Sequence, residues 1–173
     1  MKPRLLANLC AFVLCVAIFS ATIFGAIFFS ACEGDKYASL NESAPEIVAM
    51  DLEGNSVNLG DFSGQAVAIV FYKNGCEACV GALPALDNYA KSANLASIAI
   101  NMANSKEEIM EFLEETPLPN TRVLRDSLGA SAKRFIINMT PTIVLLDKEH
   151  KIRAKIIGVT DFGKVEAQIK EWL

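Results

Sequence analysis

Apolar runs separated by polar segments predict an alternation of strands and helices over residues 44–173. Short runs rich in β-branched residues predict strands. These runs lie at residues 66–72, 95–100, 121–124, 142–146 and 152–157. Ahead of them, Ile47–Met50 and Val57–Leu59 flank the turn residues Asp51–Asn55, a pattern that predicts an N-terminal β-hairpin.

Apolar residues at helical spacing occupy the intervening segments and predict four helices. They are expected at about residues 77–92, 105–115, 127–135 and 162–172. Ser105 and Glu108 fit a capping box, and Pro84 is expected to kink the first helix. The order of elements predicts a sheet flanked by helices, with parallel crossovers early and an antiparallel pair late.

The longest apolar run is residues 5–31, which hold no charged residue and follow Lys2 and Arg4. A basic start before such a run is typical of a signal peptide or an uncleaved signal anchor, and the run is long enough to span a bilayer. Phe29–Cys32 resembles a bacterial lipobox, in which Cys32 would be lipidated, although Leu is usual where Phe29 stands. Lipoprotein and anchor both stay open.

These segments predict a signal peptide or anchor at residues 1–32, a polar tether at 33–43 and one domain at 44–173. In either version the domain is membrane-anchored and lies outside the cytoplasm, in the periplasm or its equivalent in a bacterial cell envelope. Leaving out residues 1–32, with two basic residues and no acidic one, changes the net charge from −4 to −6. So acidic a domain is not expected to bind nucleic acid or anionic lipid by charge.

The candidate chemistry lies in Cys76-Glu77-Ala78-Cys79, between a predicted strand and a predicted helix. Unpaired N–H groups and the helix dipole at a helix N-terminus favour an anion, so Cys76 would have a lowered pKa and act as a nucleophile. Cys79 lies three residues further on, close enough to form a disulfide. The motif therefore predicts a dithiol/disulfide redox couple.

Two simpler interpretations of the motif are weaker. A zinc site needs two more ligands, and the other candidates are Cys10, Cys15, Cys32 and His150. A purely structural disulfide would close so small a loop that it removes little entropy from the unfolded chain.

Residues 44–173 resemble the thioredoxin superfamily, most closely the membrane-tethered TlpA/ResA-type thiol–disulfide oxidoreductases with a redoxin (AhpC/TSA-like) domain. The cysteine motif opens the first long helix, and Pro84 follows Cys79 by five residues. Thr140-Pro141, ahead of an apolar strand, resembles the cis-proline loop of the family. The resemblance implies a thioredoxin-like α/β fold with a central mixed sheet, an N-terminal hairpin extension and one inserted helix, preceded by the hydrophobic anchor.

The resemblance also implies a reaction, with the Cys76–Cys79 pair as the redox-active disulfide and no further cofactor or metal. Thr140 and Pro141 would pair with the backbone of a protein substrate. Without the resemblance to the family, Pro141 would be interpreted as an ordinary trans proline at the start of a strand. An integral-membrane donor of the DsbD/CcdA kind would recharge the pair. Apocytochrome c thiols, in cytochrome c maturation, are one client class that the family suggests.

The sequence departs from the family at several positions near the motif. Gly75 replaces a common Trp, Val70 replaces the buried acid of thioredoxins, and Ala82 replaces the ResA-type glutamate. Within and beside the motif, the charge of Glu77 should oppose thiolate formation at Cys76, Ala78 is neutral, and Lys73 could offset Glu77. We expect a couple less oxidising than those with His or Arg between the cysteines.

Two other functions remain as alternatives. A peroxiredoxin-like peroxidase would need proline and threonine where Ile69 and Lys73 stand. A non-enzymatic copper-handling module of the Sco type would use three residues between the cysteines and a distant histidine. His150 lies in a charged turn, where we expect it to be solvated.

Overall fold

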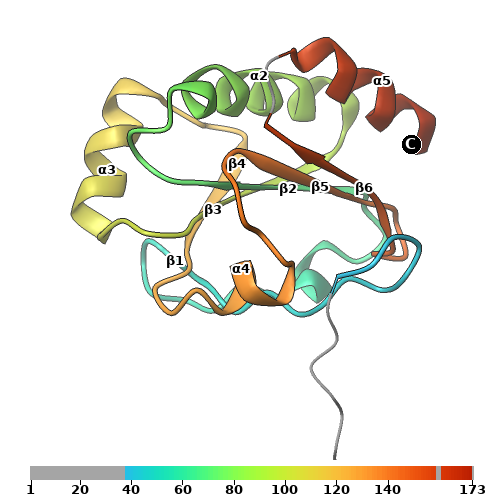
Figure 1. Ribbon diagram of the computed structural model, residues 1–173, viewed down its shortest axis with the longest axis horizontal. Coiled ribbons are helices and arrows are strands. Elements are labelled where there is room, and N and C mark those ends of the chain that lie inside the picture. The colour runs from blue at the N-terminus through green and yellow to red at the C-terminus, as the bar shows by residue number, and fades with distance from the viewer. Residues whose placement is uncertain (1–37, 159–160, 173) are drawn as a thin grey trace, which may run out of the picture. The chain divides into compact units, whose positions relative to one another are not determined.

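A six-stranded mixed sheet runs through the computed structural model, which describes residues 38–158 and 161–172 (Figure 1). The strands are β1 (Met50–Asp51), β2 (Val67–Tyr72), β3 (Ala96–Asn101), β4 (Thr121–Arg125), β5 (Thr142–Leu146) and β6 (Ile152–Ile157). They follow the order β1-β4-β3-β2-β5-β6. β2, β3 and β4 are mutually parallel, whereas β5 is antiparallel to β2 and β6. The prediction of early parallel crossovers and a late antiparallel pair is confirmed.

Helices cover both faces of this sheet. They are the 3₁₀ helix η1 (Leu59–Phe62), α2 (Glu77–Ala93), α3 (Lys106–Glu115), α4 (Ala130–Arg134) and α5 (Phe162–Trp172). Figure 1 shows α2 and α5 on one face and α4 on the other, with α3 to the side. This is a thioredoxin-like α/β fold, as predicted.

The alternation of side chains along β2 divides the core into two layers. Ala68, Val70 and Tyr72 pack with α2 and α5, whereas Val67, Ile69 and Phe71 pack on the other side with the α4 region. All six residues of β2 are buried, because the strand has a neighbour on each side and a packed layer on each face. β2 is therefore held on both faces and along both edges.

The predicted N-terminal hairpin is wrong in its strands, although its turn is confirmed. Only Met50–Asp51 forms a strand; it pairs with β4, and a single bridge to Ser56 remains of the hairpin. Ile47 and Val57 bury their side chains in the core layer on the α4 side of the sheet. Both segments of the predicted hairpin therefore pack on this face of the sheet. Tertiary packing therefore overrides the local pairing.

The helix predicted at residues 127–135 is shorter than expected and begins at Ala130. The buried carboxylate of Asp126 accepts hydrogen bonds from the N–H groups of Ala130 and Ala132, both at 2.9 Å. Gly129 adopts a φ of +64°, which closes the turn before the helix. The acid that caps the helix thus lies ahead of a three-residue turn, and this shifts the start of α4.

Residues 38–43, which the sequence assigns to the end of the tether, lie against the domain. Asn41 N–H donates to the Ile152 carbonyl at 2.8 Å, and Ser43 forms an isolated bridge with Lys151. No helix within the described ranges is long and apolar enough to cross a membrane. The apolar run at residues 5–31 and Cys32 lie outside the described residues.

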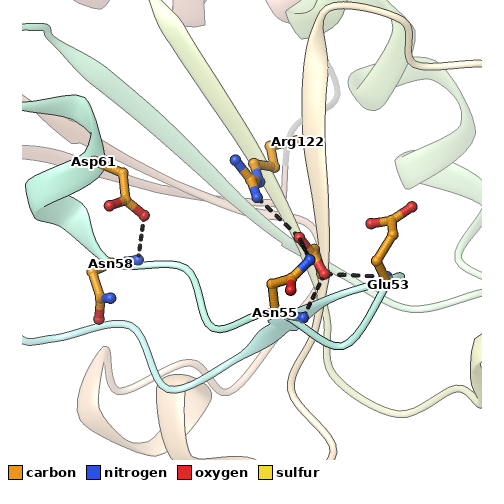
Figure 2. A network of polar contacts seen from close by, with 6 residues as sticks. Glu53, Asn55, Asn58, Asp61 and Arg122 are labelled. Carbon is orange, nitrogen blue, oxygen red and sulfur yellow. Dashed lines mark hydrogen bonds and ion pairs between the residues drawn. The ribbon is translucent and has the colours of Figure 1, made fainter.

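A carboxylate network fixes the turn after β1 (Figure 2). Asp51 accepts hydrogen bonds from the Asn55 N–H at 2.8 Å and the Glu53 N–H at 3.1 Å, and it pairs with Arg122 at 2.9 Å. The Asn55 N–H bond, with a further contribution from Arg122 and against the effect of burial, lowers the pKa of Asp51 to about 2. Asp51 therefore ties the turn to the edge of the sheet.

We expect Asp51→Asn to lower the free energy of unfolding at pH 5–7 and to matter less as the pH falls. The folded carboxyl has a lower pKa than the unfolded one, near 3.8, so its stabilisation is present above about pH 4 and is lost between about pH 4 and pH 2. Urea unfolding from pH 7 to pH 2 measures this, with Glu53→Gln as the control for removing an acid from the same turn. Wild-type and Asp51→Asn curves that stay parallel through pH 2 would contradict the prediction.

Candidate active site

The two cysteines lie where the central strand gives way to the longest helix. β2 ends at Tyr72, and Cys76 is the N-cap of α2, with a φ of −90° and a ψ of 103°. Gly75 makes the turn possible because its φ of +74° is one that L side chains rarely adopt. Cys76 and Cys79 form a disulfide, with their Cα atoms 5.2 Å apart.

The two sulfur-bearing residues differ in their access to solvent. Cys76 is half-buried at the edge of the core layer under α2, whereas Cys79 is fully buried within it. Access decides which sulfur an incoming thiol or disulfide can reach. The outer position of Cys76 fits the role of first nucleophile that the sequence predicts for it.

The first turn of α2 provides an electrostatic environment that favours a thiolate at Cys76. The Cys79 N–H donates to the Cys76 carbonyl at 3.0 Å, and the Cys76 side chain makes no capping hydrogen bond while it is in the disulfide. Opening the disulfide would leave a sulfur at the positive end of the helix dipole. Lys73, Glu77 and Ala78 are exposed, and their predicted influence on this thiolate stays a prediction.

The Thr140-Pro141 peptide bond is cis, in agreement with the resemblance. Pro141 is buried and Thr140 half-buried, immediately before β5. Because Thr142 pairs with Phe71, this loop lies at the same edge of the sheet as the cysteine motif. Its contact with a substrate stays a prediction.

Sequence reasoning missed three exposed apolar residues at this edge. Val80 follows the motif, Met139 precedes the cis-proline, and Ile157 pairs with Thr142 at the end of β6. The sequence does not show which apolar residues are exposed to solvent, so only the fold distinguishes these three from residues of the core. Met139 and Ile157 lie next to the cis-proline loop, whereas Val80 lies on α2 and borders a depression shared with Pro84 and with the segment after α3.

The surroundings of Cys79 are apolar, and they include the two positions at which the sequence departs from the acids expected by resemblance. Val70 and Ala82 are buried in the same cluster as Cys79. Tyr72 belongs to this cluster too, and burial raises its pKa to about 12. The Asn101 carboxamide lies close enough to offset part of that rise, but the Tyr72 hydroxyl forms no hydrogen bond of ordinary geometry.

His150 does not lie with the cysteines. It follows β5, whose last residue, Leu146, pairs with Val67 at the start of β2, and the cysteines follow the other end of that strand, about 16 Å away. His150 is half-buried rather than solvated, with its Nε2 atom 3.2 Å from the Phe62 carbonyl. No group of three or more potential metal ligands exists among the described residues.

A sheet with these helices, a disulfide at the N-terminus of α2 and a cis-proline loop beside it define a thioredoxin-like thiol–disulfide oxidoreductase. The Redoxin family model matches residues 39–169, and the chain belongs to this family. Within the family, its relatives include thiol–disulfide oxidoreductases of the ResA type.

Known proteins support this assignment. The chain is 25% identical to the thiol-disulfide oxidoreductase ResA of Bacillus subtilis (strain 168) over 160 residues, 91% of this chain and 87% of the relative. The fold matches the crystal structure of a putative thiol:disulfide interchange protein DsbE from Chlorobium tepidum, with a TM-score of 0.70 and 23% identity over 78% of this chain and 97% of that one. It also matches the thioredoxin domain of a thiol-disulfide oxidoreductase from Bacteroides vulgatus, with a TM-score of 0.63 and 30% identity over 76% and 98%.

We expect Tyr72→Phe to leave the free energy of unfolding unchanged or to raise it by up to about 1 kcal/mol. A buried hydroxyl without a hydrogen-bond partner loses its water on folding and gains nothing in return, so its removal costs little. Urea unfolding of the oxidised protein measures the change. Tyr72→Leu, which also deletes the ring that packs on Phe112 at 5.7 Å between centroids, is the control and should lose more than about 1 kcal/mol. A similar loss in Tyr72→Phe would show that the hydroxyl has a partner after all.

Proposed function

We propose that this protein reduces disulfide bonds of other proteins outside the cytoplasm, with Cys76 as the attacking and Cys79 as the resolving cysteine. The observation that carries the proposal is the asymmetry of the disulfide: Cys76 is accessible at the N-terminus of α2, and Cys79 is sealed in the core. A dithiol so arranged can form a mixed disulfide through Cys76 alone. The buried Cys79 can then break that mixed disulfide by attacking the Cys76 sulfur.

The reaction follows from this arrangement. The Cys76 thiolate attacks one sulfur of the substrate disulfide, and the other substrate sulfur leaves as a thiolate and takes up a proton. Cys79 then loses its proton and attacks the Cys76 sulfur, which closes the Cys76–Cys79 disulfide and frees the second substrate thiol. Two electrons pass in total from the cysteine pair to the substrate; Cys79 supplies one of the two protons, and the other replaces the proton that Cys76 released to solvent when it formed the thiolate.

The cis-proline loop and the exposed apolar side chains next to it would hold the substrate during this exchange. Thr140 is half-buried at the same edge as Cys76, and its backbone groups would pair with an extended peptide. Met139 and Ile157, both exposed and next to this loop, would contact apolar side chains beside the substrate disulfide.

The remaining parts of the proposal rest on the N-terminal sequence and on the resemblance. Residues 1–32 tether the domain to the membrane, either as an uncleaved anchor or through a lipid on Cys32. An integral-membrane thiol reductant of the DsbD/CcdA type returns electrons to the oxidised pair. The haem-site thiols of apocytochrome c are a candidate substrate class, in a role in cytochrome c maturation.

Cys79→Ser should trap a covalent adduct between Cys76 and a substrate, because the resolving thiol is gone while the accessible one remains. The adduct should run as a higher band on non-reducing gels and disappear with dithiothreitol. Cys76→Ser is the matched control and should trap far less. Wild-type turnover of a protein disulfide with no adduct in Cys79→Ser would refute the mechanism.

The reduction potential of the pair decides the direction of electron flow. We expect a value near that of thioredoxin, about −270 mV, from equilibration with glutathione or dithiothreitol buffers and quantification of the Cys76 and Cys79 peptides. A value near about −120 mV, typical of a strong oxidant, would reverse the direction and indicate disulfide insertion.

The tether is tested by the mass of the mature protein. A lipoprotein would begin at Cys32 and carry acyl chains, and Cys32→Ser would abolish this processing. An anchor would retain residues 1–31, and Cys32→Ser would change nothing. Release of an unacylated domain into the soluble fraction would contradict both forms of the tether.

A further inference from the structure

Three asparagine side chains hold the turn that carries Cys76. Asn74, two residues before Cys76, accepts a hydrogen bond on its Oδ1 atom from Asn101 Nδ2 at 3.1 Å. Its backbone N–H donates to Asn104 Oδ1 at 2.9 Å. Its own Nδ2 atom donates to the carbonyl of Glu108 in α3 at 2.8 Å. The turn between β2 and α2 is therefore joined to β3, to the loop after β3 and to α3.

Asn101 is the buried centre of this network. It is the last residue of β3, is fully buried and pairs with Tyr72 across the parallel ladder. Its Oδ1 atom accepts the Asn104 N–H at 2.8 Å and the Ala103 N–H at 3.1 Å. One carboxamide thus shapes the loop after β3 with its oxygen and holds Asn74 with its nitrogen.

The partners of the turn are themselves fixed. The Asn104 carbonyl accepts a hydrogen bond from Arg125 Nε at 3.2 Å. Glu108 stands in the capping box of α3, where the Ser105 N–H reaches its carboxylate at 2.7 Å and its own N–H reaches Ser105 Oγ at 3.2 Å. β3, the loop after it and the start of α3 therefore form a hydrogen-bonded frame for Asn74.

The segment on either side of Asn74 has little other support. Lys73 and Gly75 are exposed, and glycine adds no side chain that could limit the backbone. In the oxidised protein the disulfide itself holds Cys76 against α2. In the reduced protein this bond is absent, and the asparagine network is the connection that remains between the turn and the frame.

We propose that Asn101, acting through Asn74, is a positioning residue of the thiol–disulfide reaction, which keeps reduced Cys76 at the N-terminus of α2 and so in its reactive thiolate form. This inference rests on the proposed function of Cys76 as the nucleophile. Without the network the turn can move, Cys76 leaves the helix N-terminus, and its thiol reverts toward ordinary cysteine behaviour.

The test is the pH dependence of Cys76 alkylation in the reduced full-length chain, for the wild type, Asn74→Ala and Asn101→Ala. Iodoacetamide reacts with the thiolate, and peptide mass identifies the product at Cys76 among the other cysteines. Each variant should react at least threefold more slowly than the wild type at pH 6.5. At pH 10, where every form of the protein holds the thiolate, the rates should agree within twofold.

Ser97→Ala is the matched control. Ser97 is buried on the same strand as Asn101, and its Oγ atom accepts a hydrogen bond from Thr121 Oγ1 at 2.9 Å, far along β3 from the turn. Its pH profile should coincide with that of the wild type. An equal shift in Ser97→Ala would assign the effect to general destabilisation and overturn the proposal.

A double variant tests the route through Asn74. If Asn101 acts through Asn74, Asn74→Ala/Asn101→Ala should shift the profile no further than the larger single shift. Additive shifts would overturn the route, and unshifted profiles in both single variants would overturn the proposal. Should Asn101→Ala fail to fold, Asn74→Ala, at a half-buried turn position, decides alone. If the wild type turns over a protein disulfide but Cys79→Ser, with Asn74 and Asn101 unchanged, traps no adduct, the proposed function is refuted, whatever these profiles show.

Discussion

The register of β2 between its two neighbours is the constraint on which the site depends. Phe71 pairs with Thr142 of β5, and Tyr72 pairs with Asn101 of β3. The first pairing brings the cis-proline loop to the end of β2, and the second brings the buried carboxamide that holds the turn. A shift of this register by one residue would reverse which side chains face the helices. It would also separate the cysteine turn, the cis-proline loop and the Asn101 carboxamide.

Packing on the two faces of β2 turns that register into chemical asymmetry. The layer under α2 and α5 encloses Cys79 together with Val70 and Ala82, whereas Cys76 stays at its margin. An apolar environment disfavours the charged form of a thiol, and a helix N-terminus favours it. The fold therefore gives the two cysteines different surroundings, one at the margin of the core and one inside it, although only two residues lie between them.

The position of Asn101 links this chemistry to the rest of the sheet. Its side chain lies under the motif because β3 is parallel to β2, so both strands end at the same edge. The carboxamide can serve Asn74, Ala103 and Asn104 at once because it offers both donors and an acceptor. A buried polar group at this place is satisfied only if the turn keeps its geometry, which ties the order of the turn to the stability of the core.

Local patterns predicted the elements that packing did not have to adjust. The strands at 142–146 and 152–157 have the predicted bounds, and the Ser105–Glu108 capping box lies where its spacing indicated. The predicted hairpin did not form in full: Ile47 and Val57 pack their side chains into the core without pairing with each other. The helix α4 began late because Asp126 caps it across a turn. Local sequence patterns contain no information about the face of the sheet against which a segment will pack.

The amino-acid sequence by itself determined the redox pair, because two cysteines three residues apart at a strand-to-helix turn have one dominant chemistry. It also determined the class of fold, through the order of its apolar segments. Only the tertiary structure decided which cysteine is buried and that His150 lies at the opposite end of β2 from the pair. It also showed that Asn101 meets Asn74 across 27 residues. These properties depend on strand register and side-chain packing, which arise from contacts between residues far apart in the chain.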